Sequence, residues 1–270
     1  MPLKILFIGD VVGSPGRKIV AQVLPRLIPR WNLGLVVCNA ENSAGGSGLT
    51  AKCHEELVDA GVDVFTMGDH IYRKDEIFDL FEKTDRILRP ANFPDDAPGR
   101  PVVTLNARDG TPVAVFSLMG RTYMRPVDCP FQAADRILGR IDPSVKVIAV
   151  DVHAEATSDK QLLGRYLAGK VSAVVGTHTH VATADSKILQ GHTAYQTDLG
   201  MTGPHDSILG RRYDRVLAAT VTFVPHFYEV ATGDPQLNGA LVEVDPETGK
   251  ALQIERISIN HDEALKILKQ

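Results

Sequence analysis

The chain has 270 residues, of which 44% are hydrophobic and 23% charged, and its formal net charge is −4. This balance is typical of a soluble globular protein and excludes the collagen-like, disordered and coiled-coil classes. The small negative charge argues against stable binding to nucleic acid and against a general affinity for anionic membranes.

The three cysteines, Cys38, Cys53 and Cys129, form no Cys-x-x-Cys pair, so we expect neither a disulfide scaffold nor a structural zinc site. The apolar run that follows Lys4 is too short for a signal peptide. No segment approaches the roughly 18 apolar residues of a membrane span. We therefore expect a cytoplasmic protein that forms one domain over residues 1–270, and oligomerisation with further copies stays open.

The first two thirds of the chain alternate between predicted strands and predicted helices. Apolar, β-branched runs predict strands at 4–9, 33–38, 62–67, 102–105, 112–119, 145–150 and 171–176. Amphipathic spacing predicts helices at 15–30, 50–60, around 77–81, 131–139 and 157–168. This alternation is typical of an α/β protein with a largely central sheet.

The last third differs, because its apolar runs follow one another without predicted helices between them. They predict strands at 193–198, 216–224, 226–230, 239–245 and 251–259. Asp-Pro-Glu-Thr-Gly at 245–249 is a turn signal that joins the last two as a hairpin. We expect these strands to form a second, more antiparallel sheet.

Metal-binding and proton-transferring side chains follow five of the predicted strands. Ligands of open α/β sheets bind at the carboxyl ends of the strands, so five separate strands would bring these side chains together. One such residue alone is explained as a helix cap or a packed histidine, but five coincidences favour a site. The candidates are Asp10, Glu41, Asn42, Asp69, His70, His153, His178 and His180.

The types of side chain predict the chemistry of this site. Imidazole, carboxylate and carboxamide without thiolate suit iron, manganese or zinc. Seven candidate ligands are more than one ion needs, and paired metals about 3.5–4 Å apart are typical of phosphate-ester hydrolases. Glu41 has two carboxylate oxygens and could bridge the two ions.

Several segments resemble the calcineurin-type metallophosphoesterases, and in particular their YmdB-like branch of bacterial cyclic-nucleotide phosphodiesterases. They include FIGDVVGSPGR, NAENSAGGSGLT, FTMGDHIY, DVHAEATSDK and VVGTHTHVATAD, and the similarity covers nearly the whole chain. The chain departs from the superfamily motifs at Val12, where a histidine is usual, and at Asp69, where an asparagine is usual. The extra carboxylate of Asp69 would lower the positive field on a substrate phosphate.

The resemblance implies a four-layer α/β/β/α sandwich, two metal ions per chain, iron first and manganese as the alternative, and 2′,3′-cyclic nucleotides such as 2′,3′-cAMP as substrates. It assigns the first metal to Asp10, Glu41, Asn42 and His180, and the second to Glu41, Asp69, His153 and His178. A metal-bridging hydroxide would attack phosphorus, and His70 would protonate the departing sugar oxygen.

Two other interpretations stay open. A TIM-barrel metal amidohydrolase also uses a His-x-His motif, although there it usually follows the first strand. A non-catalytic protein of the same fold could keep the metals for structure or signalling. Arg17, Arg121, Arg125 and His205 are further candidates for substrate contact, and a surface position is the simpler expectation for each arginine.

Overall fold

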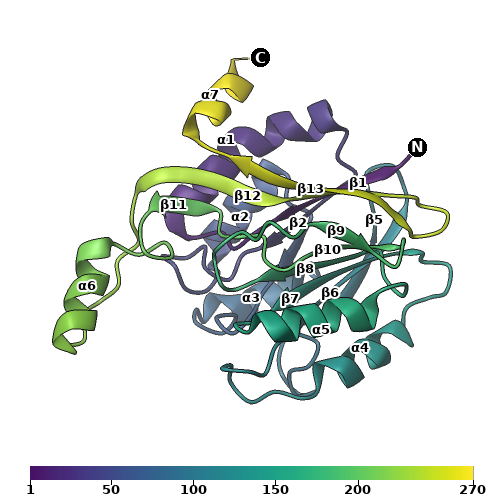
Figure 1. The fold of residues 1–270 in the computed structure, drawn as a ribbon, viewed down its shortest axis with the longest axis horizontal. Helices are drawn as coiled ribbons and strands as arrows, with labels where there is room; N and C mark the ends of the chain where they lie inside the picture. Colours follow the sequence, from purple (N-terminus) through teal and green to yellow (C-terminus); the bar gives the residue numbers. More distant parts are fainter. Residues whose placement is uncertain (270) are drawn as a thin grey trace.

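Two β-sheets pack face to face, and helices cover their outer sides (Figure 1). The computed structural model describes residues 1–269. In that part of the chain, no helix is both long and apolar enough to cross a membrane.

The first sheet has seven strands, in the order β11-β12-β1-β2-β3-β4, with β13 also paired to β12. From β1 to β4 the strands are parallel, whereas β12 runs antiparallel to β1. The strands are β1 (Leu3–Ile8), β2 (Leu35–Asn39), β3 (Val64–Thr66), β4 (Ile87–Leu88), β11 (Gly203–Asp206), β12 (Gly233–Val244) and β13 (Ala251–Ile259).

The second sheet has six strands, in the order β5-β6-β7-β8-β10-β9. The four central strands are parallel, and an antiparallel strand closes each edge. The strands are β5 (Val102–Asn106), β6 (Pro112–Met119), β7 (Val147–His153), β8 (Ala173–Thr177), β9 (Lys187–Leu189) and β10 (Thr193–Gln196).

Helices connect most of the parallel strand pairs, whereas β8 and β10 are joined by a segment that contains β9 and no helix. Thr50 caps α2, because its hydroxyl accepts a hydrogen bond from the Cys53 N–H at 3.3 Å. Gly61 ends α2 with a φ of 104°, a conformation that favours glycine. The helices are α1 (Gly13–Trp31), α2 (Ala51–Ala60), α3 (Glu76–Lys83), α4 (Pro130–Leu138), α5 (Thr157–Leu167), α6 (Tyr213–Thr222) and α7 (His261–Leu268).

Three apolar layers hold the sandwich together, and β1 shows how the sequence builds them. Its side chains alternate, so Leu6 and Ile8 face the helices while Ile5 and Phe7 face the second sheet. The third layer lies between the second sheet and the helices α4 and α5. The order helix, sheet, sheet, helix confirms the predicted α/β/β/α sandwich and excludes a TIM barrel.

The prediction for the last third of the chain was wrong in three respects: two of its strands are absent, and its last two strands do not belong to a second, more antiparallel sheet. Residues 216–224 lie mostly in the helix α6, and residues 226–230 form no regular strand. The valines and threonines there favour a strand by propensity, but the segment lies away from the edge of either sheet and has no strand to pair with (Figure 1). The predicted hairpin of β12 and β13 is confirmed, although it extends the first sheet instead of building the second.

Candidate metal centre

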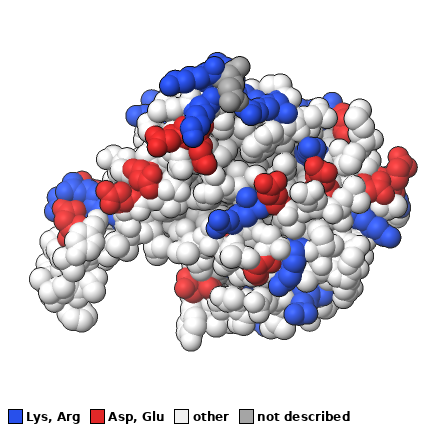
Figure 2. Space-filling view, turned by 45° about the horizontal axis from the view of Figure 1, so that its top comes forward, with Lys and Arg blue, Asp and Glu red and all other residues white. Residues whose placement is uncertain are grey.

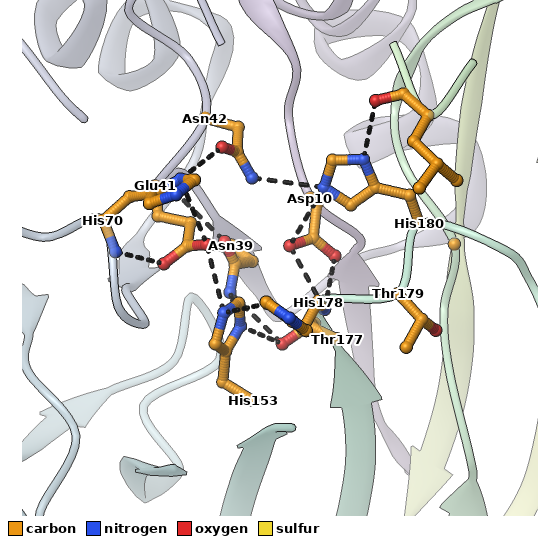
Figure 3. Close-up of polar contacts among 12 residues, drawn as sticks. Asp10, Asn39, Glu41, Asn42, His70, His153, Thr177, His178, Thr179 and His180 are labelled. Atoms are coloured by element: carbon orange, nitrogen blue, oxygen red, sulfur yellow. Dashed lines mark hydrogen bonds and ion pairs between the residues drawn. The ribbon is translucent and has the colours of Figure 1, made fainter. Parts of the chain in front are cut away.

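The predicted site residues meet where the carboxyl ends of strands from both sheets converge (Figure 3). Asp10 follows β1, Glu41 follows β2 and Asp69 follows β3, all in the first sheet. His153 ends β7 and His178 follows β8, both in the second sheet. The site therefore lies across the junction of the two sheets.

Four ligand atoms, one each from Glu41, Asp69, His153 and His178, lie within 4.8 Å of one another. Nε2 of His153 lies 3.0 Å from Oε1 of Glu41, 3.2 Å from Oδ1 of Asp69 and 3.0 Å from Nδ1 of His178. The side chains of His153 and Glu41 are almost completely buried. Two carboxylates and two imidazole nitrogens around one point are a suitable donor set for a cation.

A second group lies beside the first and consists of Asp10, Asn42 and His180. Nε2 of His180 lies 3.9 Å from Oδ1 of Asp10 and 3.2 Å from Nδ2 of Asn42. The charge of Glu41 acts on Asp10, so the two groups are electrostatically connected. All seven predicted ligands thus lie in two adjacent groups.

Each of the three histidines has an oxygen partner on its outer nitrogen. Nδ1 of His153 lies 2.9 Å from Oγ1 of Thr177. That hydroxyl donates to Asp151, so it accepts from the imidazole. Nε2 of His178 lies 3.1 Å from a carboxylate oxygen of Glu155, and Nδ1 of His180 lies 3.1 Å from the carbonyl oxygen of Leu209. These contacts orient each ring with its other nitrogen toward the site, as in metal-ligating histidines.

The buried carboxylates and imidazoles of the site shift one another's pKa values. Burial raises the pKa of Asp10 to about 6, against the opposing effect of His180 and His153. Burial would also raise the pKa of Asp69, but the hydrogen bond and charge of His153 hold it below its ordinary value. Burial would lower the pKa of His153, yet the charge of Glu41 raises it well above the ordinary value. A proton on His153 or a metal ion would balance these carboxylates.

His70 lies at the side of both groups. Its Nδ1 is 2.8 Å from Oδ1 of Asn42, and its Nε2 is 3.7 Å from Oδ2 of Asp69. Its backbone N–H donates to Oε2 of Glu41 at 3.2 Å. The ring is partly exposed and lines the pocket above the site. It is therefore positioned to transfer a proton to or from a bound molecule.

Gly68 lets the first sheet approach the buried imidazole of His153. A Cβ atom at this position would lie 2.1 Å from Cδ2 and 2.2 Å from Nε2 of that ring. Any larger residue would displace the ring from the site. The glycine in the sequence FTMGDH therefore serves the packing of the site.

A buried network that sequence analysis did not identify holds the loop carrying His178 and His180. Both residues have positive φ values, 92° and 64°, which are unfavourable for residues with a Cβ. Asp198 fixes the loop between them, since it accepts from the Thr179 N–H at 3.2 Å and from its hydroxyl at 2.6 Å. Lys160 on α5 pairs with Asp198 at 2.6 Å, and both side chains are buried. Asp198 lies two residues after the end of β10, the same spacing as that between Asp10 and β1.

The pocket above the site has a volume of about 370 Å³, within the range of small-molecule sites. Its apolar wall comes from a segment that sequence analysis did not assign to the site. This wall consists of Ile208, Leu209, Val216 and Tyr228. A small ligand could reach the buried ligand groups from this pocket.

The other candidates for substrate contact, Arg17, Arg121, Arg125 and His205, do not line this pocket. Arg17 pairs with Glu56 at 2.6 Å. Arg125 lies over the ring of Phe93, 5.6 Å from its centroid. Nε2 of His205 lies 3.0 Å from Nδ2 of Asn238, although residues 208–211 of the same loop do line the pocket.

An α/β/β/α sandwich with carboxylates and imidazoles at the strand ends of both sheets is the architecture of the metallophosphoesterases. Within this class the chain belongs to the YmdB-like family, whose model, described as "YmdB-like protein", matches residues 6–257. The resemblance seen in the sequence is thereby confirmed.

Named relatives and solved structures match over nearly the whole chain. The chain is 46% identical to the 2′,3′-cyclic-nucleotide 2′-phosphodiesterase of Bacillus subtilis (strain 168), over 96% of this chain and 98% of the relative. A solved protein of Thermus thermophilus superimposes with a TM-score of 0.90 at 38% identity, over 96% and 99% of the two chains. A solved phosphatase of Mycoplasma pneumoniae also gives a TM-score of 0.90, at 31% identity over 100% and 97%.

Proposed function

We propose that the protein is a metal-dependent phosphodiesterase that hydrolyses 2′,3′-cyclic nucleotides. The observation that carries the proposal is the set of three imidazoles whose outer nitrogens are held by oxygen atoms. Their inner nitrogens face the carboxylates of Glu41, Asp69 and Asp10. The named activity of the Bacillus relative supports the choice of substrate, since the two chains align over almost their full lengths.

The seven ligand residues fit two ions. Asp10, Asn42 and His180 would hold one ion together with Glu41, which would also contact the second ion. Asp69, His153 and His178 would complete the second site, where four donor atoms already lie within 4.8 Å of one another. The donors are oxygen and imidazole nitrogen without thiolate, which suits iron or manganese, and we propose iron first.

Bound metal ions, Fe(2+) or Fe(3+) first and Mn(2+) as the alternative, would supply Lewis-acid stabilisation of the phosphoryl oxygens and an activated water. The protein's own side chains would position the substrate and transfer protons. His70 lies at the pocket side of the ligand groups, and its Nε2 lies 3.7 Å from Oδ2 of Asp69. We assign it the protonation of the departing sugar oxygen, because a ribose alkoxide leaves poorly without a proton.

The free state of Cys38, Cys53 and Cys129 fits a reducing compartment, and we propose the cytoplasm as the site of action. We also propose that residues 1–270 form one domain, since the candidate metal centre takes residues from both sheets. A small diffusible substrate fits the pocket better than a nucleic-acid duplex does.

Hydrolysis of 2′,3′-cAMP by protein reconstituted with iron or manganese tests the proposal. We expect a mononucleotide product and loss of activity with a chelator. Reconstituted protein that binds two ions but cleaves neither 2′,3′-cAMP nor a nitrophenyl phosphodiester would instead support a non-catalytic metal protein.

A further inference from the structure

The apolar wall of the pocket lies directly beside the candidate metal centre. The carbonyl oxygen of Leu209 is 3.1 Å from Nδ1 of His180, so the wall contacts one of the proposed metal ligands. Glu41 and His178 line the same pocket of about 370 Å³. A phosphate ester bound at these ligand groups would have the rest of its molecule in the pocket, within reach of the wall.

Hydrogen bonds within the protein hold the wall in place. Ile208 and Arg211 bond to each other across a tight turn, with N–H to carbonyl distances of 2.8 and 2.9 Å. The guanidinium of Arg211 donates to the carbonyl oxygen of Tyr228 at 3.0 Å and to those of Gly45 and Gly46 in the loop after β2. The two parts of the wall are thus tied to each other and to the first sheet. A preformed surface binds a rigid ring with little loss of conformational entropy.

The wall presents hydrocarbon and one aromatic residue to the pocket. Leu209 is 51% exposed, Tyr228 is 43% exposed and Ile208 is 42% exposed. The segment that supplies Val216 and Tyr228 is uncharged, because residues 216–228 contain no Lys, Arg, Asp or Glu, and its projecting tip is white in Figure 2. Branched aliphatic and aromatic side chains bind the faces of flat, neutral rings. A nucleobase is a ring of this kind.

The polar side chains of the pocket are engaged close to the ligand groups. The Thr179 hydroxyl donates to Asp198 at 2.6 Å, and a carboxylate oxygen of Glu155 lies 3.1 Å from Nε2 of His178. The wall itself consists of Ile, Leu, Val and Tyr side chains, so its only polar side-chain group is the Tyr228 hydroxyl. Strong discrimination between similar ligands needs hydrogen bonds from several placed polar groups. This wall can therefore bind the face of a base without reading its edges.

We propose that the apolar wall is a nucleobase subsite and that it accepts all four bases. The proposal rests on the proposed function: the phosphate of a 2′,3′-cyclic nucleotide lies at the metal centre, and its base stacks on Tyr228 and contacts Leu209. Stacking tolerates any base, because every base has a π-face. The wall adds to the affinity for the substrate, whereas His70 and the metal ligands carry out the chemistry.

Steady-state kinetics with substrates that differ only in the base test the proposal. We expect the 2′,3′-cyclic phosphates of adenosine, guanosine, cytidine and uridine to have kcat/KM values within about tenfold of one another. Methyl riboside 2′,3′-cyclic phosphate lacks the base, and its KM should be about 5–100-fold higher, the range of one base–aromatic stack. Equal KM values with and without the base would overturn the proposal, as would a preference above about 100-fold for one base.

Replacement of Tyr228 distinguishes stacking from hydrogen bonding and from general packing. Tyr228→Ala should raise KM for 2′,3′-cAMP by about 5–100-fold, with kcat and the KM of the base-free ester unchanged. Tyr228→Phe keeps the ring and should keep the wild-type KM; a defect equal to that of Tyr228→Ala would refute stacking. Leu209→Asn suits the φ of 50° at this position and should raise KM by a smaller factor. Tyr123→Ala, at an 89% exposed position outside the pocket, is the matched control.

A binding measurement separates failure of the base subsite from failure of the proposed function. Manganese-loaded protein is titrated calorimetrically with adenosine 3′-monophosphate and with methyl riboside 3-phosphate, which lacks the base. We expect the nucleotide to bind at least about fivefold more tightly, and Tyr228→Ala to remove this difference. Equal affinities in the wild type would overturn the base subsite. Protein that shows the difference in affinity but cleaves neither cyclic ester would support the base subsite and refute the proposed function.

Discussion

Replacement of Lys160 by methionine tests how the loop that carries His178 and His180 is held in place. The Lys160 side chain is 2% exposed, and its Nζ lies 2.6 Å from Oδ2 of Asp198. Methionine keeps the length and apolar character of the side chain but removes the charge. Asp198 then keeps its hydrogen bonds from Thr179 and from the Gly200 N–H, but it is buried without a cation.

Breaking a buried ion pair from one side costs about 3–5 kcal/mol, because the remaining charge stays desolvated. Three protein donors still satisfy Asp198 after the replacement, so we expect the lower end, about 3 kcal/mol. The loop that carries His178 and His180 would also be held less firmly, because Asp198, which binds Thr179 between them, would lose its ion pair with Lys160. Loss of such outer contacts typically weakens metal affinity by about 10–100-fold.

Urea denaturation of the metal-free protein measures the first effect, and manganese titration of the native protein measures the second. Lys170→Met is the matched control, because Lys170 is half-exposed and lies 3.7 Å from Asp135. Exposed pairs of this kind contribute about 1 kcal/mol or less. Adding Asp198→Asn to Lys160→Met should recover part of the stability. A loss below about 1 kcal/mol for Lys160→Met, equal to that of the control, would refute the reasoning.

Three further predictions concern the metal centre itself. Metal analysis of Glu41→Ala should show loss of both ions, whereas the wild type should hold about two per chain; a full complement in the variant would contradict a bridging role. Asp69→Asn removes one negative charge, so metal affinity should fall while turnover at saturating metal stays similar or rises; a large loss of turnover would mean that Asp69 moves a proton. His70→Ala should slow hydrolysis of 2′,3′-cAMP by about 10²–10⁴-fold and that of a nitrophenyl phosphodiester much less, with both ions retained. Equal losses on the two substrates would exclude His70 as the proton donor.

The sequence allowed the ligand groups to be predicted because strand order and strand direction bring their ends together. Asp10, Glu41 and Asp69 are far apart in the chain, but each follows a parallel strand of the same sheet. The pairing of the two sheets then brings His153 and His178 to the same place. Each of these residues could be identified from a buried apolar run followed by a polar side chain.

The parts of the site that could not be predicted depend on contacts between distant segments. Lys160 lies on an amphipathic helix, where a lysine normally indicates the solvent-exposed face. Only the packing of α5 against the second sheet shows that its side chain reaches Asp198. The sequence predicts strands at 216–224 and 226–230 because the Val and Thr residues there have high β-propensity, and propensity alone does not reveal the absence of a neighbouring strand.

The position of the metal centre across both sheets links metal binding to the folding of the whole chain. In the proposed metal sites, residues after β1, β2 and β3 would supply ligands from the N-terminal part, and β7 and the loop after β8 would supply the histidines from the middle. Neither sheet alone contains the complete donor set of either proposed site, so an ion would bind tightly only after the two sheets have packed. A ligand present at 100 times its Kd stabilises the state that binds it by about 2.7 kcal/mol. Metal supply in the growing cell would therefore determine how much of the newly made chain persists as folded protein.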